Sequence, residues 1–359
     1  MPEKLRIAVV GSGIGASHII AFQNLPEQYD VVAICDIDEA KARDVAETFH
    51  IPRVVTNMDD VCRMDDVDVI DICTPPYLHF SQIQQALAAD KYVICEKPLV
   101  GSLKQVDELM AVEAQSSKRV MPIFQYRFGH GLQKLKFLIE QGVAGTAYLS
   151  TVETAWRRRA EYYAVPWRGK WKTEMGGTLL SHAVHSHDML TYVLGSVKSV
   201  FARTTTRVNP IEVEDCAAAS LEMADGSLAT FAATLGSPEE ITRHRFCFSG
   251  LVAESNTKPY HNSHEPWKFI GDTAELSEQI TATLERFQPL PERFEGQFYR
   301  FQQAVQHGTE LPVTLADARA ALELVTAMYV SSRTSQPVEL PFDTNHPAYE
   351  SWLPEESRQ

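Results

Sequence analysis

Short apolar runs alternate with amphipathic segments through the first third of the chain. The apolar runs lie at residues 5–10, 31–35, 69–73, 92–95 and 119–124. The amphipathic stretches between or beside them are Glu39–Phe49, Phe80–Ala89 and Leu103–Gln115. Nearly continuous apolar runs are typical of parallel strands covered on both faces. Strand followed by helix, repeated, predicts right-handed crossovers and a doubly wound parallel sheet, which is an α/β fold of the Rossmann type.

The pattern changes beyond about residue 128. Longer segments with strand character follow at 147–156, 197–208, 216–223, 227–235 and 243–249, with turn signals such as Asp225-Gly226. These features predict an open, mostly antiparallel sheet. Helices are expected near 131–141, 175–194, 295–306 and 315–332, while 251–291 shows no clear order. We therefore expect a dinucleotide-binding domain at 1–125, an α+β domain at 126–341 that binds substrate and forms oligomers, and a polar tail at 342–359.

Composition narrows the function classes. The 359 residues carry a formal net charge of −14, which argues against nucleic acid or an anionic membrane as partner. No apolar run approaches the roughly 18 residues of a membrane span, and the N-terminal residues show no apolar leader. Six cysteines without a Cys-x-x-Cys pair indicate buried thiols rather than a disulfide framework. A cytoplasmic protein is expected.

A glycine-rich turn follows the first apolar run, in the order Gly11-Ser12-Gly13-Ile14-Gly15-Ala16. Glycines between a strand and a helix allow positive φ and close approach of the backbone to a pyrophosphate, which the helix N-terminus then binds. The alternative is a tight turn without a ligand. Asp36 ends the second run, where a carboxylate binds the hydroxyls of an adenine ribose and repels a 2′-phosphate. Asp36 could instead cap the following helix; NAD is preferred to NADP, although Lys41 and Arg43 lie further into that helix.

The run Val93-Ile94-Cys95 leads directly into Glu96-Lys97-Pro98. Because proline cannot continue a strand, the strand stops there and leaves Lys97 at its carboxyl end. Ligands of open α/β sheets bind at this edge. The motif therefore indicates an enzyme that handles a dinucleotide and uses a lysine near the nicotinamide.

Together these motifs resemble the Gfo/Idh/MocA family of NAD(P)-dependent sugar and cyclitol oxidoreductases, from Ile7 to Pro341. Besides the glycine turn, the resemblance rests on Thr74-Pro75-Pro76 with His79, Glu96-Lys97-Pro98, Tyr126-Arg127-Phe128, Gly142–Gly145, Gly176-Gly177 with His185 and Asp188, and Val338–Pro341. The resemblance implies a Rossmann domain followed by an open antiparallel α/β domain, with substrate held between them. It also implies that Thr74, Pro75, His79, Glu96 and Lys97 contribute to cofactor binding, and that the protein forms a homodimer or homotetramer.

Oxidation of an alcohol requires a hydride acceptor and a base for the hydroxyl proton. The resemblance implies that Lys97 and His185 lie near the reacting carbon, with His185 the better direct proton acceptor because imidazole titrates near neutrality. The alternatives are a salt bridge of Lys97 with Glu96 and a core histidine at position 185. Many relatives carry an aspartate four residues before this histidine, where this chain has Ser181. The inositol-type proton relay is therefore in question, and Asp188 is a second candidate for orienting His185.

Aromatic and basic residues gather in three short segments, Trp156–Arg159, Tyr162-Tyr163 and Trp167–Trp171. Aromatic faces with basic donors suit polyhydroxylated rings, a carboxylate or a phosphate, and also suit a subunit interface. The resemblance makes Arg127, Trp167, Arg168, Ser181 and His182 expected substrate-binding residues with Lys97 and His185. His182 and His185, three apart, could also share a helix face and hold zinc with His187 or Asp188; we expect no metal.

The sequence thus predicts an NAD-dependent dehydrogenase that oxidises an aldose to a lactone, or a secondary ring hydroxyl of a sugar or cyclitol to a ketone. Ser181 favours the aldose slightly. The alternatives are a dehydrogenase of a carboxylated cyclic hemiacetal, a non-catalytic sensor that binds NAD and a sugar, and an NAD-assisted glycosidase or lyase.

Overall fold

The computed structural model describes residues 4–357. Residues 1–3, part of the segment behind the cytoplasmic expectation, and 358–359, the end of the expected tail, lie outside the described residues. The chain forms two compact units, and neither is one continuous stretch of sequence. The first consists of 1–124 and 294–319, and the second of 125–293 and 320–359. The domain boundaries expected from sequence stay a prediction.

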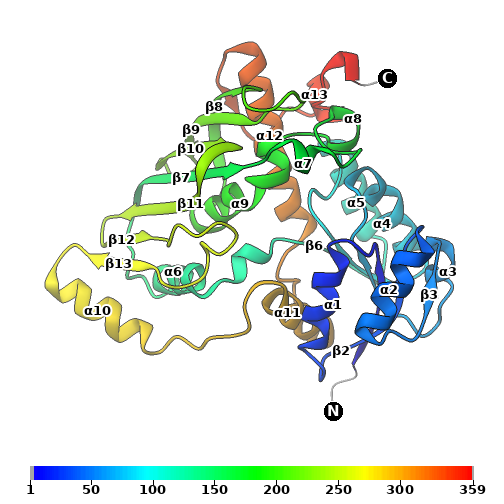
Figure 1. The fold of residues 1–359 in the computed structure, drawn as a ribbon. Helices are drawn as coiled ribbons and strands as arrows, with labels where there is room; N and C mark the ends of the chain where they lie inside the picture. Colours follow the sequence, from blue (N-terminus) through cyan, green and yellow to red (C-terminus); the bar gives the residue numbers. More distant parts are fainter. Residues whose placement is uncertain (1–3, 358–359) are drawn as a thin grey trace. The chain divides into compact units, whose positions relative to one another are not determined.

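A six-stranded parallel sheet, sheet A, forms the centre of the first unit (Figure 1). Its strand order is β3-β2-β1-β4-β5-β6. The strands are β1 (Leu5–Val10), β2 (Tyr29–Cys35), β3 (Val54–Val55), β4 (Val69–Ile72), β5 (Tyr92–Cys95) and β6 (Val120–Pro122). Ile7, Val9, Ile70 and Ile94 are fully buried, as expected for strands covered on both faces. The predicted doubly wound parallel sheet is confirmed.

Helices connect the strands of sheet A. They are α1 (Gly15–Gln23), α2 (Glu39–Phe49), α3 (Met58–Cys62), the short η1 (Pro76–Leu78), α4 (His79–Ala88) and α5 (Leu103–Glu113). A late segment completes this unit, because α11 (Arg293–His307) packs beside α1 (Figure 1). Phe298 of α11 stacks on Phe22 of α1, with ring centroids 4.2 Å apart, and the Gln297 side-chain oxygen accepts a bond from the Phe124 amide at 3.1 Å.

An eight-stranded, mostly antiparallel sheet, sheet B, forms the centre of the second unit, in the order β13-β12-β11-β7-β10-β9-β8-β14. Its strands are β7 (Ala147–Arg157), β8 (Val197–Thr205), β9 (Cys216–Met223), β10 (Leu228–Thr234), β11 (Gly236–Phe248), β12 (Leu251–Glu254), β13 (Lys268–Gly271) and β14 (Val338–Glu339). Only β7 and β10 run parallel to each other. Burial alternates along β10, with Phe231 buried and Leu228 exposed, so one face of the sheet packs inward.

The remaining elements of the second unit are mostly helical. They are η2 (Gln125–Phe128), α6 (His130–Glu140), α7 (Ala160–Tyr163), α8 (Trp171–Glu174), the π-helical turn η3 (Thr178–His182), α9 (Val184–Leu194), α10 (Ala274–Leu284) and α13 (Pro347–Glu350). Helix α12 (Leu315–Thr334) begins within residues 294–319 of the first unit and continues in the second unit, which also contains η4 (Glu355–Ser357). Helix α9 packs against β7 and β11. Among residues 4–357, no helix combines the length and apolar character needed to cross a membrane.

Three segments differ from the sequence-based expectation. The helix expected at 175–194 is divided at Ala183 into η3 and α9. The unordered stretch 251–291 contains β12, β13 and α10, short elements whose periodic signal is weak. The tail expected to be merely polar contains Trp352, which is fully buried and donates its indole N–H to the Met175 carbonyl at 2.7 Å.

Candidate active site

The glycine turn lies between β1 and α1, at the carboxyl edge of sheet A. Gly11 has φ +105°, and a Cβ there would lie 2.6 Å from the Cys73 carbonyl oxygen, so only glycine fits. At Gly13 a Cβ would meet nothing within 4 Å, which leaves open space beside the backbone. Gly15 allows α1 to approach β1, since a Cβ there would lie 2.8 Å from a Val9 methyl. A tight turn, an open backbone approach and close helix packing are what a dinucleotide pyrophosphate requires.

Asp36 follows β2 and turns its carboxylate toward the glycine turn. One oxygen accepts the Ser12 backbone N–H at 2.8 Å and its hydroxyl, and the other accepts the Asp38 N–H at 3.0 Å. Partial burial would raise the Asp36 pKa, but these bonds bring it below its usual value. The carboxylate is therefore ionised and has lone pairs left for ribose hydroxyls.

The helix cap that was the alternative role for Asp36 belongs to Asp38, which accepts the Lys41 N–H at 3.3 Å at the start of α2. The Lys41 ammonium also pairs with Asp38 at 3.1 Å, and Arg43 pairs with Glu39. Both basic groups that could have bound a 2′-phosphate thus have acidic partners on their own helix, which supports the preference for NAD.

The turns after β4 and β5 are tied together by His79. Its two ring nitrogens lie 2.9 Å from the carbonyl oxygens of Thr74 and Pro98. His79 is fully buried, and desolvation lowers its pKa despite these carbonyls. Thr74 donates its hydroxyl to Gln82 at 2.6 Å. His79 therefore joins the two turns by hydrogen bonds. The expected contacts of His79, Thr74 and Pro75 with a cofactor stay predictions.

Glu96 and Lys97 follow β5 directly. Glu96 is buried, and one of its carboxylate oxygens accepts the Lys97 backbone N–H at 3.0 Å. Lys97 is half-buried. Because β1, β4 and β5 are neighbours in sheet A, Lys97 lies on the same carboxyl edge as the glycine turn.

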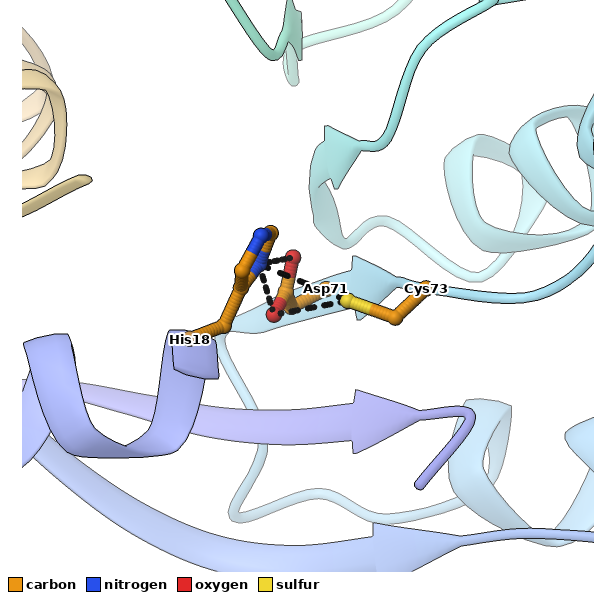
Figure 2. Close-up of side chains that lie close together, drawn as sticks. All are labelled: His18, Asp71 and Cys73. Atoms are coloured by element: carbon orange, nitrogen blue, oxygen red, sulfur yellow. Dashed lines mark hydrogen bonds and ion pairs between the residues drawn. The ribbon is translucent and has the colours of Figure 1, made fainter. Parts of the chain in front are cut away.

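A buried cluster beneath this edge was not anticipated from the sequence (Figure 2). His18 of α1 is fully buried, and its Nδ1 lies 2.9 and 3.1 Å from the two oxygens of Asp71 in β4. Its Nε2 lies 3.2 Å from Glu96 Oε1. Burial alone would lower the His18 pKa, but Asp71 raises it well above its usual value. Burial would likewise raise the Glu96 pKa, but the bond to His18 holds it below normal.

Donor atoms of His18, Asp71 and Cys73 all lie within 4.8 Å of one another, as metal ligands would. Burial, however, raises the pKa of the Cys73 thiol, which favours its protonated form. The Cys73 sulfur lies 3.5 Å from an Asp71 oxygen and 3.4 Å from His18 Nδ1. A protonated thiol at hydrogen-bond distance from its neighbours fits a network of hydrogen bonds better than it fits a metal centre.

In the second unit, His185 lies in the first turn of α9, buried against Tyr126 of η2. The two rings stack with centroids 4.3 Å apart and an interplanar angle of 12°. Asp188, expected as a partner of His185, binds the Arg127 guanidinium, with Oδ1–Nη2 2.6 Å and Oδ2–Nε 2.9 Å. Arg127 also lies 4.9 Å from the centre of the Tyr192 ring. This buried, bidentate ion pair gives Arg127 a structural role, and its expected contact with substrate stays a prediction.

Ser181 and His182 belong to η3, which Glu214 holds in place. The Glu214 carboxylate accepts the N–H groups of Gly177 and Leu179 at 3.0 and 2.9 Å, and the Tyr329 hydroxyl at 3.0 Å. Full burial raises the Glu214 pKa to about 7. Gly177 is needed for this contact, because a Cβ there would lie 1.8 Å from the Glu214 carbonyl oxygen.

Aromatic rings and two arginines cluster beside η3. Arg168 lies over the rings of Tyr162 and Trp167 at 4.0 and 4.3 Å. His182 meets Tyr162 at 5.4 Å between ring centroids. Arg158 lies over Trp156 and Tyr162, both at 5.2 Å. Each arginine also has a carboxylate nearby: Glu240 lies 3.1 Å from Arg158 and Glu174 lies 3.6 Å from Arg168.

In the zinc alternative for this region, His187 keeps a possible ligand atom. Its Nε2 bonds to the Leu179 carbonyl at 3.2 Å, which leaves Nδ1 as the other ring nitrogen, and burial lowers its pKa to about 4, which favours the neutral ring. Asp188 is held by Arg127 as described above.

These features define a class of protein. A glycine turn between β1 and α1 of a parallel sheet in the order 3-2-1-4-5-6, with an acidic residue ending β2, is the dinucleotide-binding arrangement of Rossmann-fold dehydrogenases. Residues 5–124 match the family model of the Gfo/Idh/MocA oxidoreductase family, NAD-binding Rossmann fold, and residues 136–340 match its C-terminal alpha/beta domain. The chain belongs to this oxidoreductase family.

Relatives cover nearly the whole chain. The "uncharacterized oxidoreductase YrbE" of Bacillus subtilis is 26% identical over 95% of this chain and 98% of its own length. D-glucoside 3-dehydrogenase of Escherichia coli is 26% identical over 94% and 97%. Among solved structures, the WlbA dehydrogenase of Bordetella pertussis in complex with NADH and UDP-GlcNAcA has a TM-score of 0.83 and 25% identity, over 95% of this chain and 100% of that one. These findings confirm the family, the fold class, the NAD-binding domain and the assignment as a dehydrogenase.

Proposed function

We propose that the protein oxidises a secondary ring hydroxyl of a sugar or cyclitol to a ketone, with Lys97 and His185 handling the proton. The observation that carries the proposal is the position of Lys97, which follows β5 at the same edge of sheet A as the glycine turn after β1. When bound, NAD supplies the hydride acceptor. Gly11, Ser12, Gly13, Ile14, Gly15 and Asp36 would hold it.

Each proton-handling residue has a separate task. Lys97 donates to the substrate oxygen and stabilises the negative charge that develops as the hydroxyl proton leaves. His185 receives that proton, and its ring plane is fixed by the stack on Tyr126. Ser181 and His182, which η3 carries, together with Trp167 and Arg168, are proposed to contact the remaining hydroxyls of the substrate.

The comparison with D-glucoside 3-dehydrogenase supports a ring hydroxyl over the aldose carbon that Ser181 favoured, because that relative is matched almost end to end. The arginine–aromatic cluster supports an uncharged substrate. Glu240 and Glu174 oppose the charges of Arg158 and Arg168, so the cluster offers aromatic faces with little net positive charge. This argues against the carboxylated hemiacetal, although the WlbA structure holds an acidic sugar nucleotide, so sugar acids belong in the test.

The test is a panel of D-glucosides, aldoses, inositols and sugar acids with NAD⁺ or NADP⁺, followed by reduced-cofactor absorbance. We expect turnover with NAD⁺ and a glucoside or cyclitol. Lys97→Met should lower kcat by roughly 100-fold or more, as loss of a donor that stabilises developing negative charge does. The matched control is Lys104→Met, on the exposed side of α5 in the same unit, which should leave kcat unchanged.

Other outcomes point to the other functions. NAD binding without turnover of any panel member would favour the sensor. Cleavage of a glucoside without accumulation of NADH would favour the NAD-assisted glycosidase or lyase. Equal loss in both lysine variants would show that the effect does not come from the site.

A further inference from the structure

The cluster beneath the carboxyl edge of sheet A places one basic ring between two acids. His18 reaches Asp71 through Nδ1 and Glu96 through Nε2, at 2.9 and 3.2 Å. A neutral imidazole carries one N–H and one bare lone pair, so one carboxylate would face another acceptor. Only a ring with both nitrogens protonated donates to both acids. The geometry therefore describes an imidazolium held between two carboxylates.

The surroundings support a fixed internal charge. His18 and Asp71 are completely buried, and Glu96 is nearly so. A buried positive charge requires negative partners, and here they are Asp71 in β4 and Glu96 after β5. Cys73 and Lys97 are the other titratable groups at this cluster, and the Lys97 cation acts on Glu96. The hydroxyl of Tyr29 in β2 donates to the Phe298 carbonyl at 2.6 Å and not to the carboxylates of this cluster.

Aromatic rings of α11 close the remaining side of the cluster. Phe294 lies 4.4 Å and Phe298 5.3 Å from the His18 ring, measured between centroids. These rings exclude water from the ion pairs, which strengthens them, since the local dielectric constant is low. The Glu96 carboxylate is thus held on one oxygen by His18, while its other oxygen holds the Lys97 backbone N–H at 3.0 Å.

We propose that His18 is a positioning residue for hydride transfer: doubly protonated and anchored on Asp71, it fixes Glu96, and Glu96 fixes the backbone from which Lys97 reaches the substrate. His18 itself touches neither substrate nor cofactor in this scheme. The inference rests on the proposed function for the role of Lys97, but its statement about the charge of His18 does not.

The charge is tested without any substrate. In protein labelled with ¹⁵N-histidine, the His18 signal, assigned by its loss in His18→Gln, should show both ring nitrogens protonated at pH 8. His244 provides an internal reference, because its Nε2 bonds to the Ser186 carbonyl while Nδ1 faces the Asn262 amide, and burial lowers its pKa to about 4. It should appear as a neutral ring in the same spectrum. A neutral His18 at pH 7 to 8 would overturn the proposal.

The positioning role is tested with a double-mutant cycle. His18→Gln and Glu96→Gln should each lower kcat about 10- to 100-fold through misplacement of Lys97, and the double variant should be no slower than the slower single variant, because both act on one path. His18→Gln should keep NAD affinity within about threefold of the parent protein, since the His18 side chain bonds to none of the residues proposed above to hold NAD. His307→Gln, exposed at the end of α11, is the kinetic control.

Losses that multiply in the double variant would show that His18 acts independently of Glu96, and would overturn the positioning role. If His18→Gln fails to fold, the spectrum of the parent protein still decides the charge, and the milder Glu96→Asp variant tests the path by the same kcat measurement. If the panel yields no turnover, the dehydrogenase proposal fails while the spectrum stands on its own.

Discussion

At the scale of single residues, we propose that Asp36 separates the two cofactors. Its ionised carboxylate lies beside the glycine turn, where an adenine ribose is proposed to bind, and the nearby Lys41 and Arg43 are paired with acids of their own helix. A 2′-phosphate would therefore meet negative charge without a free cation. We therefore expect Asp36 to exclude NADP by repulsion as much as it selects NAD by hydrogen bonds.

Asp36→Ala should raise the ratio of kcat/KM for NADP⁺ to that for NAD⁺ by about 10-fold or more, equivalent to about 1.4 kcal/mol of relative binding. The measurement is initial rates with each cofactor at a saturating sugar concentration. Asp38→Ala is the matched control, since it removes an acid two residues away that caps α2. An equal change of the ratio in both variants would contradict the assignment and point to general electrostatics.

At the scale of elements, the π-helical turn η3 depends on one buried carboxyl group. The Glu214 carboxyl group accepts hydrogen bonds from two backbone N–H groups and one hydroxyl. In most helix starts, such N–H groups are bound by several different acceptors. Because the folded-state pKa of Glu214 is raised to about 7 from an ordinary 4.5, the folded protein holds a proton that the unfolded chain has already lost. Its contribution to the free energy of unfolding therefore decreases as pH rises from about 4.5 to 7.

Glu214→Gln removes this titration. The stability of the variant relative to the parent should improve as pH rises from 5 to 8, by at most about 3 kcal/mol for a shift of this size. Urea unfolding at several pH values measures it. Glu212→Gln is the control, because Glu212 also accepts a backbone N–H, at 3.1 Å, but is exposed. Parallel curves for the parent and Glu214→Gln would refute the titration.

The elements differ in how far the sequence predicts them. Periodicity gave α2 its bounds and located β1, β5 and β9, because long or strongly apolar segments carry clear signals. The break at Ala183 carries none, since the turn is set by Glu214, which is more than 30 residues away in the chain. Tertiary contacts of this kind are not encoded in local pattern.

The candidate site shows the same division. Motif order singled out Lys97, Asp36 and His185, whereas the pairs Arg127–Asp188 and His18–Asp71 come only from the folded structure. For the second pair a signal existed. His18 lies on the helix face of Gly15, Ile19 and Phe22, and Asp71 interrupts an otherwise apolar strand. A basic and an acidic residue that must both be buried are expected to pair.

At the scale of the whole molecule, sheet B has a face on which several large apolar side chains are exposed. Leu149 and Leu228 are opposite each other on β7 and β10 and are 43% and 53% exposed, and Ile270 of β13 is 57% exposed. Phe201 of β8 is 37% exposed. Apolar side chains spread along an open sheet favour association with a second copy, in line with the expected homodimer or homotetramer.

Leu228→Glu should therefore reduce the molar mass in solution toward the 40.2 kDa of one chain, as measured by size-exclusion chromatography with light scattering. A charge at the centre of an apolar interface lacks a partner and opposes association. Leu290→Glu, at a 39% exposed residue outside sheet B, is the control. A parent protein that is already monomeric, or an unchanged mass in Leu228→Glu, would show that the oligomer does not form through this face.

The division of the first unit into 1–124 and 294–319 has a consequence during synthesis. The aromatic rings that cover His18 and stack on Phe22 belong to α11, which leaves the ribosome only after residues 125–293 of the second unit. Until then the nascent cofactor-binding half exposes an uncovered ionic cluster and an unpaired apolar helix face. The N-terminal part of the first unit therefore stays incompletely packed while residues 125–293 are synthesised. A chain truncated before residue 294 would not form a smaller working domain and would be a target for chaperones and proteases.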